Sequence, residues 1–297
     1  MLTENPIKLP GNEPIRDPMI LPYNGRYYMV GTCAPFWTGA NPGVKLWVSE
    51  DLINWRFVKL LIDASEIDDE KPYKDRFWAP EILHYKNKFY LTFNACNESQ
   101  AKLSESLRSW VAVSDDIEGP YEICERPLLP DVTTNDANMF VDDDGQVYVF
   151  LTDQPRIVWL HFDPETCHTY GEPHTVIATG ADGEWDHVGI EGSFVIKRGG
   201  IYYHWYSSWT NSYEMGLAVT DNLEKPFQKC DCNPVISGYG FETKFKYCGH
   251  NSCFTMPDGR EMTAFHASGD DFEESLCINE VKYPFEKSMI PSDTVDI

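Results

Sequence analysis

The chain is 297 residues long, and its hydrophobic (42%) and charged (24%) fractions are those of a globular protein with a large core. Its formal net charge of −23 argues against nucleic-acid and anionic-membrane partners, because like charges repel. Aromatic residues make up 14% of the chain, which favours β-structure and carbohydrate-binding surfaces.

The N-terminus carries no basic start and no apolar run of signal-peptide length, and no later stretch reaches the roughly 20 apolar residues of a membrane helix. The nine cysteines are odd in number and scattered. This favours reduced thiols in a cytoplasmic protein, or a secreted one if a signal peptide has been removed. Four of the cysteines do not have the spacing of a zinc site, and we interpret them as structural: Cys230, Cys232, Cys248 and Cys253.

Five similar strand openings recur 55 to 62 residues apart, and their first residues are Asp17, Ala79, Asp136, Glu191 and His250. Each opening leads into a short apolar strand. A glycine-containing hairpin turn follows in four of the five repeats, and Asn-Gly or Asp-Gly pairs supply the positive φ angles that a tight hairpin requires. The turns are predicted at Asn24-Gly25, Lys86-Asn87-Lys88, Asp144-Gly145, Gly199-Gly200 and Asp258-Gly259.

After each turn the chain continues with an aromatic strand, and then with a third strand that ends on a polar corner. The remaining length leaves room for a fourth, outer strand, and no segment has a convincing amphipathic helical period. The sequence therefore predicts an all-β chain, a five-bladed β-propeller that forms a single domain over residues 1–297, with blades beginning near 17, 79, 136, 191 and 250. A β-sandwich or a pair of all-β domains is the alternative for regularly spaced short strands.

Equivalent strands of a propeller begin at the same end of its central axis, so the five first residues are expected to converge on one axial pocket. Blades of a five-fold ring lie about 72° apart, which places Asp17 on the first blade about 144° from Glu191 on the fourth. Asp136, on the third blade, is then the neighbour of Glu191. Because side chains alternate along a strand, Asp17 can face the pocket only if Arg16 faces away, unless the strand begins with an irregular turn.

Two carboxylates facing each other across a pocket, with a third beside one of them, favour acid–base chemistry. The like charge of Asp136 is expected to keep Glu191 protonated near neutral pH, whereas the more distant Asp17 can stay ionised. Glu191 is thus the predicted general acid, Asp17 the predicted general base, and Asp136 the residue that tunes and orients the acid. A separation of roughly 6.5–9.5 Å between acid and base leaves room for a water and predicts inversion at a sugar carbon. Each carboxylate could instead be a turn or cap residue, and coupled carboxylates could share the proton differently.

These motifs resemble those of glycoside hydrolase family 43 over nearly the whole chain. Arg16-Asp17-Pro18 resembles the general-base motif of the family, and Glu191-Gly192-Ser193 resembles its general-acid motif. The segment from Asp136 to Gly145 resembles its pKa-modulating segment. The resemblance implies an inverting enzyme on a five-bladed propeller.

Two further motifs resemble the family. The run Phe77-Trp78-Ala79-Pro80-Glu81 resembles its second-blade signature, in which Trp78 would help to wall the sugar subsite. Gly249-His250-Asn251-Ser252 resembles the fifth-blade motif whose histidine, here His250, commonly contacts a calcium ion or its waters in the channel. Because calcium prefers oxygen ligands, we expect a water-mediated contact, with a buried core histidine as the alternative. No organic cofactor is expected.

The resemblance implies a small oligosaccharide substrate and the release of a terminal pentose, α-L-arabinofuranose or β-D-xylose, from hemicellulose or pectin. The arginine before Asp17 is similar to that of the xylosidase and arabinofuranosidase branches. Four aromatic side chains, of which the last could equally pack within its blade, are candidates for stacking on a sugar: Phe36, Trp37, Trp78 and Trp209.

One departure from the family bears on the sugar. The fifth-blade strand at Ser275-Leu276-Cys277-Ile278 contains no arginine, although a basic residue is common there. The alternatives are an endo-arabinanase or galactosidase on the same scaffold, a retaining β-fructosidase and a non-catalytic glycan-binding propeller. The fructosidase is disfavoured because the chain has no Asn-Asp-Pro-Asn motif near its N-terminus. The sequence does not indicate an oligomeric state.

Overall fold

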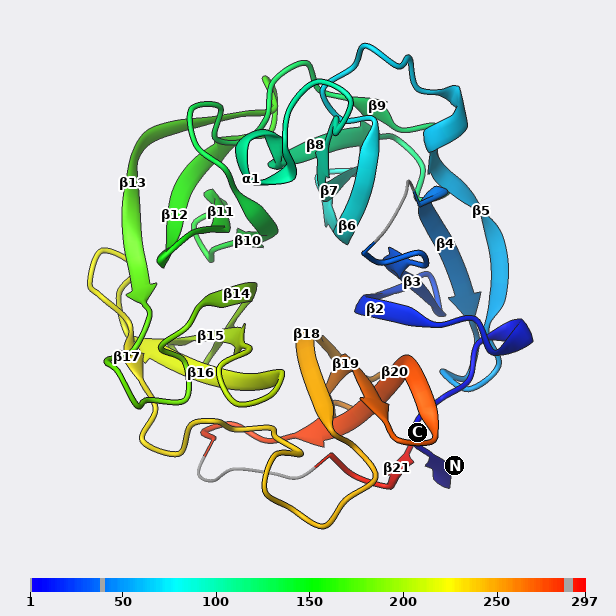
Figure 1. Cartoon of the computed structure of the whole chain (residues 1–297), viewed down its shortest axis with the longest axis vertical. Helices are drawn as coiled ribbons and strands as arrows, with labels where there is room; N and C mark the ends of the chain where they lie inside the picture. The colour runs from blue at the N-terminus through cyan, green and yellow to red at the C-terminus, as the bar shows by residue number, and fades with distance from the viewer. Residues whose placement is uncertain (1, 38–40, 286–290) are drawn as a thin grey trace.

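Five antiparallel sheets stand around a central axis as the blades of a ring in the computed structural model, which describes residues 2–37, 41–285 and 291–297 (Figure 1). The predicted five-bladed β-propeller is confirmed. The first strand of each sheet faces the axis, and the later strands follow outward in chain order. Within the described ranges, no helix has the length and apolar character needed to cross a membrane.

Four sheets have four strands, and the described part of the fifth has three. They comprise β2 (Ile15–Tyr23), β3 (Arg26–Cys33), β4 (Gly43–Ser49) and β5 (Arg56–Asp63); β6 (Asp75–Tyr85), β7 (Lys88–Cys96), β8 (Arg108–Ser114) and β9 (Glu122–Ile123); β10 (Asn135–Val141), β11 (Val147–Asp153), β12 (Arg156–Asp163) and β13 (His168–Ala178); β14 (Ile190–Arg198), β15 (Ile201–Ser208), β16 (Glu214–Thr220) and β17 (Gln228–Lys229); and β18 (Tyr247–Thr255), β19 (Glu261–Gly269) and β20 (Phe272–Val281). The remaining elements are β1 (Leu2–Glu4), β21 (Thr294–Asp296), the short helix α1 (Leu103–Ser106) and two 3-10 turns, Pro10–Asn12 and Ala64–Glu66.

The inner hairpins turn where the sequence predicts. Asn24 and Gly25 join β2 to β3 with φ angles of 49° and 73°, and Gly199 and Gly200 join β14 to β15 with φ angles of 58° and 80°. Positive φ at both turn positions matches the right-handed twist of the flanking strands, which is why these residue types occur there.

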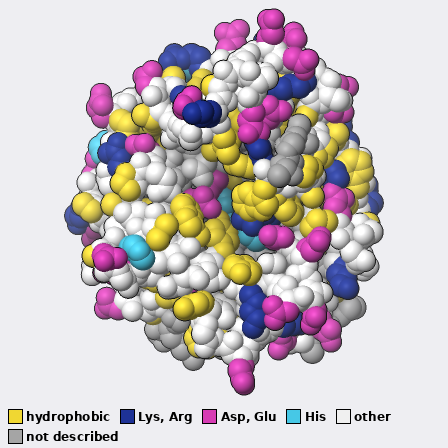
Figure 2. Space-filling model, in the orientation of Figure 1, with side chains coloured by type: hydrophobic (Ala, Val, Ile, Leu, Met, Phe, Trp, Pro, Cys, Tyr) yellow, Lys and Arg dark blue, Asp and Glu magenta, His cyan; other side chains and the backbone are white. Residues whose placement is uncertain are grey.

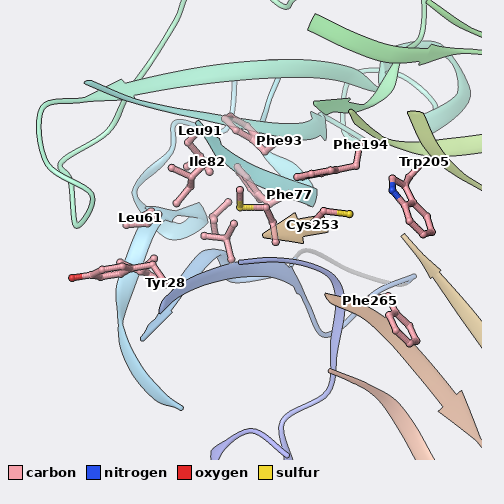
Figure 3. Packing of buried hydrophobic residues seen from close by; sticks show 14 of the residues in the cluster. Tyr28, Leu61, Phe77, Ile82, Leu91, Phe93, Phe194, Trp205, Cys253 and Phe265 are labelled. Carbon is pink, nitrogen blue, oxygen red and sulfur yellow. The ribbon is translucent and has the colours of Figure 1, made fainter. Parts of the chain in front are cut away.

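Large aromatic and aliphatic side chains fill the space between neighbouring blades. Phe77 of β6 and Phe93 of β7 are fully buried, with their rings stacked at 5.7 Å between centroids. They pack in one cluster with Tyr28 and Leu61 of the first blade (Figure 3). Burial of such side chains from water is the main favourable term that holds one blade against the next.

The two ends of the chain meet at the fifth blade (Figure 1). β1 pairs antiparallel with β21, and Ile7 forms a β-bridge to Leu276 of β20. Between them, the buried Asn5 side chain donates to the carbonyls of Ile278 (2.8 Å) and Ser292 (2.9 Å) and accepts from the Ile278 N–H (3.1 Å). The N-terminal segment therefore lies against the outer edge of the fifth blade and closes the ring.

Each inner strand begins with a β-bulge at which one residue has left-handed backbone. These residues are Asp17 (φ 52°), Ala79 (44°), Asp136 (57°), Gly192 (69°) and His250 (51°). The pairing register shifts at the same places, between Arg16 and Met19 for example. The sequence predicts that Glu191 and Asp17 are equivalent positions, and this is wrong. Glu191 corresponds to Arg16, since each pairs with the matching position of the second strand, Ser207 and Thr32 respectively.

Hydrogen bonds between blades hold most of these left-handed residues. In four of the five, the backbone N–H donates to a polar side chain on the second strand of the preceding blade: Asp17 to His266 (3.1 Å), Ala79 to Thr32 (2.7 Å), Asp136 to Asn94 (2.9 Å) and His250 to Ser207 (2.9 Å). In the remaining case, on the fourth blade, the N–H of Gly192 binds Asp136 Oδ2 instead (2.9 Å). Thr152 of β11 stands where the other blades place the acceptor, and its Oγ1 is buried without a partner among the described residues.

Replacing Asn5 by alanine is expected to lower the free energy of unfolding by about 1–3 kcal/mol, because buried backbone groups of the fifth blade lose their partner. Urea unfolding followed by tryptophan fluorescence measures this change. Lys8→Ala, at an exposed position of the same segment, is the control and should leave the midpoint unchanged. Equal midpoints for both variants would show that the N-terminal segment does not contribute to ring closure.

Candidate active site

The strand openings surround a hollow at the centre of one face of the ring. Figure 2 shows hydrophobic side chains gathered around this hollow, with acidic, basic and histidine side chains inside it. Asp17, Asp136 and His250 are buried there, and Glu191 is half-buried. The structure thus brings together the three predicted catalytic carboxyls and the predicted metal-site histidine.

Asp17 is fixed on both of its carboxylate oxygens. Thr32 Oγ1 donates to Oδ2 (2.6 Å), while Oδ1 lies 3.4 Å from the Nδ1 atoms of both His250 and His266. Thr32 also accepts the N–H of Ala79, so one hydroxyl links the carboxylate to the neighbouring blade. The position of Asp17 is therefore set by three strands other than its own.

His266 acts as a neutral support beneath Asp17. Its Nδ1 accepts the Asp17 N–H and so carries no proton, which places the single ring proton on Nε2. Burial, with smaller contributions from Arg16 and His250, lowers the pKa of His266 well below its usual value. The close approach of Nδ1 to the Asp17 carboxylate is therefore not an ion pair.

Asp136 is held by backbone and side-chain donors from two neighbouring blades. Asn94 Nδ2 donates to Oδ1 (2.8 Å), and the N–H of Gly192 donates to Oδ2 (2.9 Å). Burial raises the pKa of Asp136 above its ordinary value, and the nearby Asp17 charge acts in the same direction. Because Gly192 follows Glu191 directly, Asp136 holds the backbone beside Glu191.

Glu191 is positioned by two donors at the mouth of the pocket. Tyr213 Oη donates to Oε1 (2.8 Å), and Asn135 Nδ2 donates to Oε2 (3.2 Å). Burial, followed by the charge of Asp136, raises the pKa of Glu191 to about 7. Burial is thus the larger cause, whereas the sequence pointed only to the charge. A Cβ at Gly249 would lie 2.1 Å from the Tyr213 ring, so glycine there gives Tyr213 its place.

His250 lies between two of the carboxylates. Its Nδ1 is 3.4 Å from Asp17 Oδ1 and 3.7 Å from Asp136 Oδ2. Burial opposes protonation, but the surrounding carboxylates, Asp17 foremost, outweigh it and raise the pKa of His250. The described residues contain no group of three or more His, Cys, Asp and Glu side chains arranged to hold a metal ion.

A fourth carboxyl, Glu81, lies deeper along the axis and was not among the predicted site residues. A cavity of about 230 Å³ is lined by one residue or more from the inner strand of every blade, among them Met19, Glu81, Asn138, Phe194 and Cys253. Asn138 Nδ2 donates to Glu81 Oε2 (2.6 Å), and burial raises the pKa of Glu81 to about 8. Glu81 is therefore mainly protonated at neutral pH and adds little negative charge beneath the pocket.

Three of the four predicted sugar-stacking residues lie together above the first and second blades. Trp78 Nε1 donates to the Phe36 carbonyl (3.0 Å), and the rings of Trp37 and Trp78 meet edge to face at 6.0 Å. Trp37 is 61% exposed, so much of its side chain is open to solvent. Trp209 is 40% exposed and lies on another side of the pocket, over Gly189, where a Cβ would come within 2.2 Å of its ring.

Several contacting residues were missed by the sequence interpretation. Thr32, Asn94 and His266 occupy matching positions in the second strands of different blades, where each is a buried polar residue among mainly apolar ones. That polar position, repeated at the period of the blades, is a signal that the sequence offered. Tyr213 and Asn135 offered none, because only the fold brings them to Glu191.

The arrangement suits proton transfer in two directions. Glu191 holds its proton to about neutral pH and is accessible from the mouth, whereas Asp17 is buried among acceptors and donors that fix its orientation. A group that donates a proton and a group that accepts one, on opposite sides of an axial pocket, can assist the cleavage of a bond between them.

Comparisons with known proteins give a family match over nearly the whole chain. The model of the family described as glycosyl hydrolases family 43 matches residues 3–285. Xylosidase/arabinosidase 43B of Humicola insolens is 28% identical over 86% of this chain and 47% of its own length, and a β-xylosidase of Bacillus subtilis (strain 168) is 24% identical over 85% and 47%. The chain thus spans about half the length of these relatives.

A solved structure is similar over its whole length. The crystal structure of a thermostable family-43 glycoside hydrolase superimposes with a TM-score of 0.84 at 26% identity, covering 99% of this chain and 98% of that one. The propeller described above is therefore shared as a complete fold.

Tyr213→Phe is expected to raise the pKa of Glu191 above about 7, because the hydroxyl that stabilises the ionised carboxylate is lost while the ring stays in place. The pKa is measured by 13C NMR titration of labelled glutamate carboxyls, assigned with Glu191→Gln. Tyr239→Phe, at an exposed position before β18, is the control. An unchanged or lowered Glu191 pKa in Tyr213→Phe would contradict the assignment of this hydrogen bond.

Proposed function

Because this chain belongs to glycosyl hydrolases family 43, we propose that it is an inverting glycoside hydrolase that releases a terminal pentose from oligosaccharides of plant hemicellulose or pectin. The pentose is α-L-arabinofuranose, β-D-xylose or both. The observation that carries the proposal is the pair of carboxyl groups in the axial pocket: Glu191, whose pKa is raised to about 7, and Asp17, whose carboxylate Thr32 holds in place.

Glu191 acts as the general acid in this proposal. A glycosidic oxygen needs a proton as its bond to the sugar carbon breaks, and Glu191 is protonated in a substantial fraction of molecules up to about pH 7. Tyr213 and Asn135 hold its two oxygens, so the proton is presented from one position. Asp136 supports the acid by its charge and by its bond to the N–H of Gly192.

Asp17 acts as the general base. It accepts a proton from a water that attacks the sugar carbon on the face opposite the leaving group, which inverts the configuration. Thr32 and the backbone bond to His266 keep the carboxylate in place, and neither contact brings a positive charge. Net transfer is one proton from water to Asp17 and one from Glu191 to the departing oxygen.

The choice of a pentose is supported by the names of the relatives and by aromatic side chains beside the pocket. Trp37 and Trp78 offer aromatic surface beside the first and second blades, and Trp209 offers it beside the fourth. Their faces suit the CH surface of a small sugar ring.

We further propose that any calcium ion in the channel is bound through waters beside His250. The Nδ1 atom of His250 faces Asp17 and Asp136, which leaves Nε2, for which the described residues provide no hydrogen-bond partner, to meet a water of hydration. Such an ion would supply positive charge near the carboxylates. The acid and base steps above use protein groups and water.

The proposed function is tested by incubating the protein with aryl pentosides and with short xylo- and arabino-oligosaccharides, and by following the products by 1H NMR. Release of a single pentose with inverted anomeric configuration is expected. First appearance of the retained anomer would indicate a fructosidase-like double displacement. Internal fragments without monosaccharide would indicate an endo-acting enzyme, and absence of any turnover would indicate a binding protein.

Asp17→Asn is expected to reduce kcat about 10²–10⁴-fold on all substrates, because the base is lost. Glu191→Gln should show a similar loss on oligosaccharides but a small one on 2,4-dinitrophenyl glycosides, whose leaving group needs no proton. In the wild type, kcat/KM on oligosaccharides should fall as the pH rises through about 7, where Glu191 loses its proton, and Glu191→Gln should lack this fall. The controls are Asp115→Asn and Glu125→Gln, both exposed. Normal hydrolysis of oligosaccharides by both site variants contradicts the assigned roles.

The calcium proposal predicts that protein treated with EDTA and desalted is stabilised when calcium is returned, because the ion binds only the folded state. Thermal unfolding with and without 1 mM CaCl2 measures the shift. His250→Gln should abolish it. A wild-type midpoint that does not respond to calcium rules out an ion at this position.

A further inference from the structure

Arg16 lies in the pocket beside Asp17, where its side chain contacts two aromatic rings and a carboxylate. Its guanidinium lies 4.7 Å from the Trp37 ring centroid and 5.4 Å from that of Tyr213. Nη1 is 3.3 Å from Glu274 Oε1 on β20, and the Arg16 side chain is 13% exposed. Two aromatic rings and one carboxylate thus hold the cation in a single orientation.

The bulge in β2 is what turns Arg16 toward the pocket. In a regular strand Arg16 would point away from Asp17, but the left-handed Asp17 breaks the alternation. Arg16 holds the place in the first blade that Glu191 holds in the fourth. Burial opposes its charge, yet neighbouring acidic groups, foremost Asp17, raise its pKa overall, so it remains a cation.

Most of the donors of Arg16 are not used by the protein. A guanidinium has five N–H donors, and the described residues provide Arg16 with one side-chain hydrogen bond, from Nη1 to Glu274. None of the Arg16 side-chain nitrogens is both buried and without a hydrogen-bond partner, unlike Nη1 of Arg76. The unused donors of Arg16 therefore reach solvent-accessible space.

We propose that Arg16 binds the sugar itself, by donating hydrogen bonds from its unused guanidinium edge to hydroxyl oxygens of the ring held between Asp17 and Glu191. Trp37 and Tyr213 fix the plane of the guanidinium, and Glu274 is a positioning residue that fixes its rotation. A planar cation with two parallel donors suits a pair of neighbouring hydroxyls. This inference rests on the proposed function.

Arg16 thereby links recognition to catalysis. Tyr213 contacts both the guanidinium, through its ring, and Glu191, through its hydroxyl. A sugar whose hydroxyls meet Arg16 is therefore placed against the side chain that orients the general acid. A sugar without those hydroxyls leaves a desolvated cation unpaired, and this is the source of the expected discrimination.

The test compares hydroxyl dependence in the wild type and in Arg16→Met. Its probes are the 4-nitrophenyl β-D-xylopyranoside or α-L-arabinofuranoside, whichever the wild type hydrolyses faster, and the monodeoxy analogues of that substrate. For at least one hydroxyl, the wild type should lose about 10- to 100-fold in kcat/KM on deoxygenation, as expected for a hydrogen bond to a charged group. Arg16→Met should lose a similar factor on the parent substrate and little more on that analogue.

Two further variants separate binding from folding. Arg16→Lys keeps the charge without the planar pair of donors and should keep only part of the discrimination. Glu274→Gln should lower it by raising KM more than it lowers kcat. Arg26→Met, which removes an exposed arginine from the far end of the first blade, is the control and should match the wild type. Thermal unfolding identifies a variant that fails to fold, in which case Glu274→Gln and Arg16→Lys decide the result.

Undiminished discrimination against every deoxy analogue in folded Arg16 variants overturns the inference while leaving the hydrolase in place. If the wild type hydrolyses no glycoside, the proposed function fails, and Arg16 is judged by the binding of D-xylose and L-arabinose, measured by saturation-transfer NMR. Weaker binding in Arg16→Met then supports the inference independently, and unchanged binding overturns it.

Discussion

Hydrogen bonds between neighbouring blades hold one residue near the start of each inner strand in left-handed backbone, and the pocket depends on them. For residues with a side chain, this conformation costs roughly 1–2 kcal/mol. At Asp17, Ala79, Asp136 and His250, the N–H is bound by a polar side chain of the preceding blade, which offsets that cost. The ring thereby becomes cooperative, because the geometry at the head of one blade is fixed by its neighbour. Glycine replaces a side-chain-bearing residue only at Gly192, where the N–H binds Asp136 on the inner strand of the preceding blade and the second strand of that blade supplies no acceptor.

The bulges allow two consecutive residues of one strand to serve the pocket. Asp17 and Asp136, at the left-handed positions, lie deep and are nearly enclosed, whereas Arg16 and Glu191, one residue earlier, lie nearer the mouth. A buried base and a more exposed acid follow from this difference in depth. Proton donation to a leaving group must occur where the rest of the substrate departs, so the shallow position suits Glu191. Activation of water needs a fixed, shielded carboxylate, so the deep position suits Asp17.

Burial is the main source of the proton affinities in the pocket, and charge refines them. Glu81, Asp136 and Glu191 all have raised pKa values with burial as the first cause. Positive groups limit the effect, since His250 lies between two carboxylates and Arg16 lies at the mouth. The raised pKa values of these carboxyls and the positive charges of His250 and Arg16 keep the net charge along the axis low. A pocket lined by four carboxyls can then receive a neutral sugar without a large desolvation cost.

The sequence by itself determined the repeat, the hairpin turns and therefore the five blades, because these depend on local residue types and on a regular period. It also identified the three carboxyls, since each stands at a strand opening within a specific motif. The sequence aligned Glu191 with Asp17, although Gly192 is the residue that matches Asp17. The ordinary Gly-Ser pair after Glu191 gives no local sign of the β-bulge that shifts the register there. Only the tertiary structure decided that Arg16 faces the pocket, that Tyr213 and Asn135 hold the acid, and that Glu81 lies on the axis. These contacts join residues from different blades, and their distances depend on how the blades pack, which no single segment of sequence specifies.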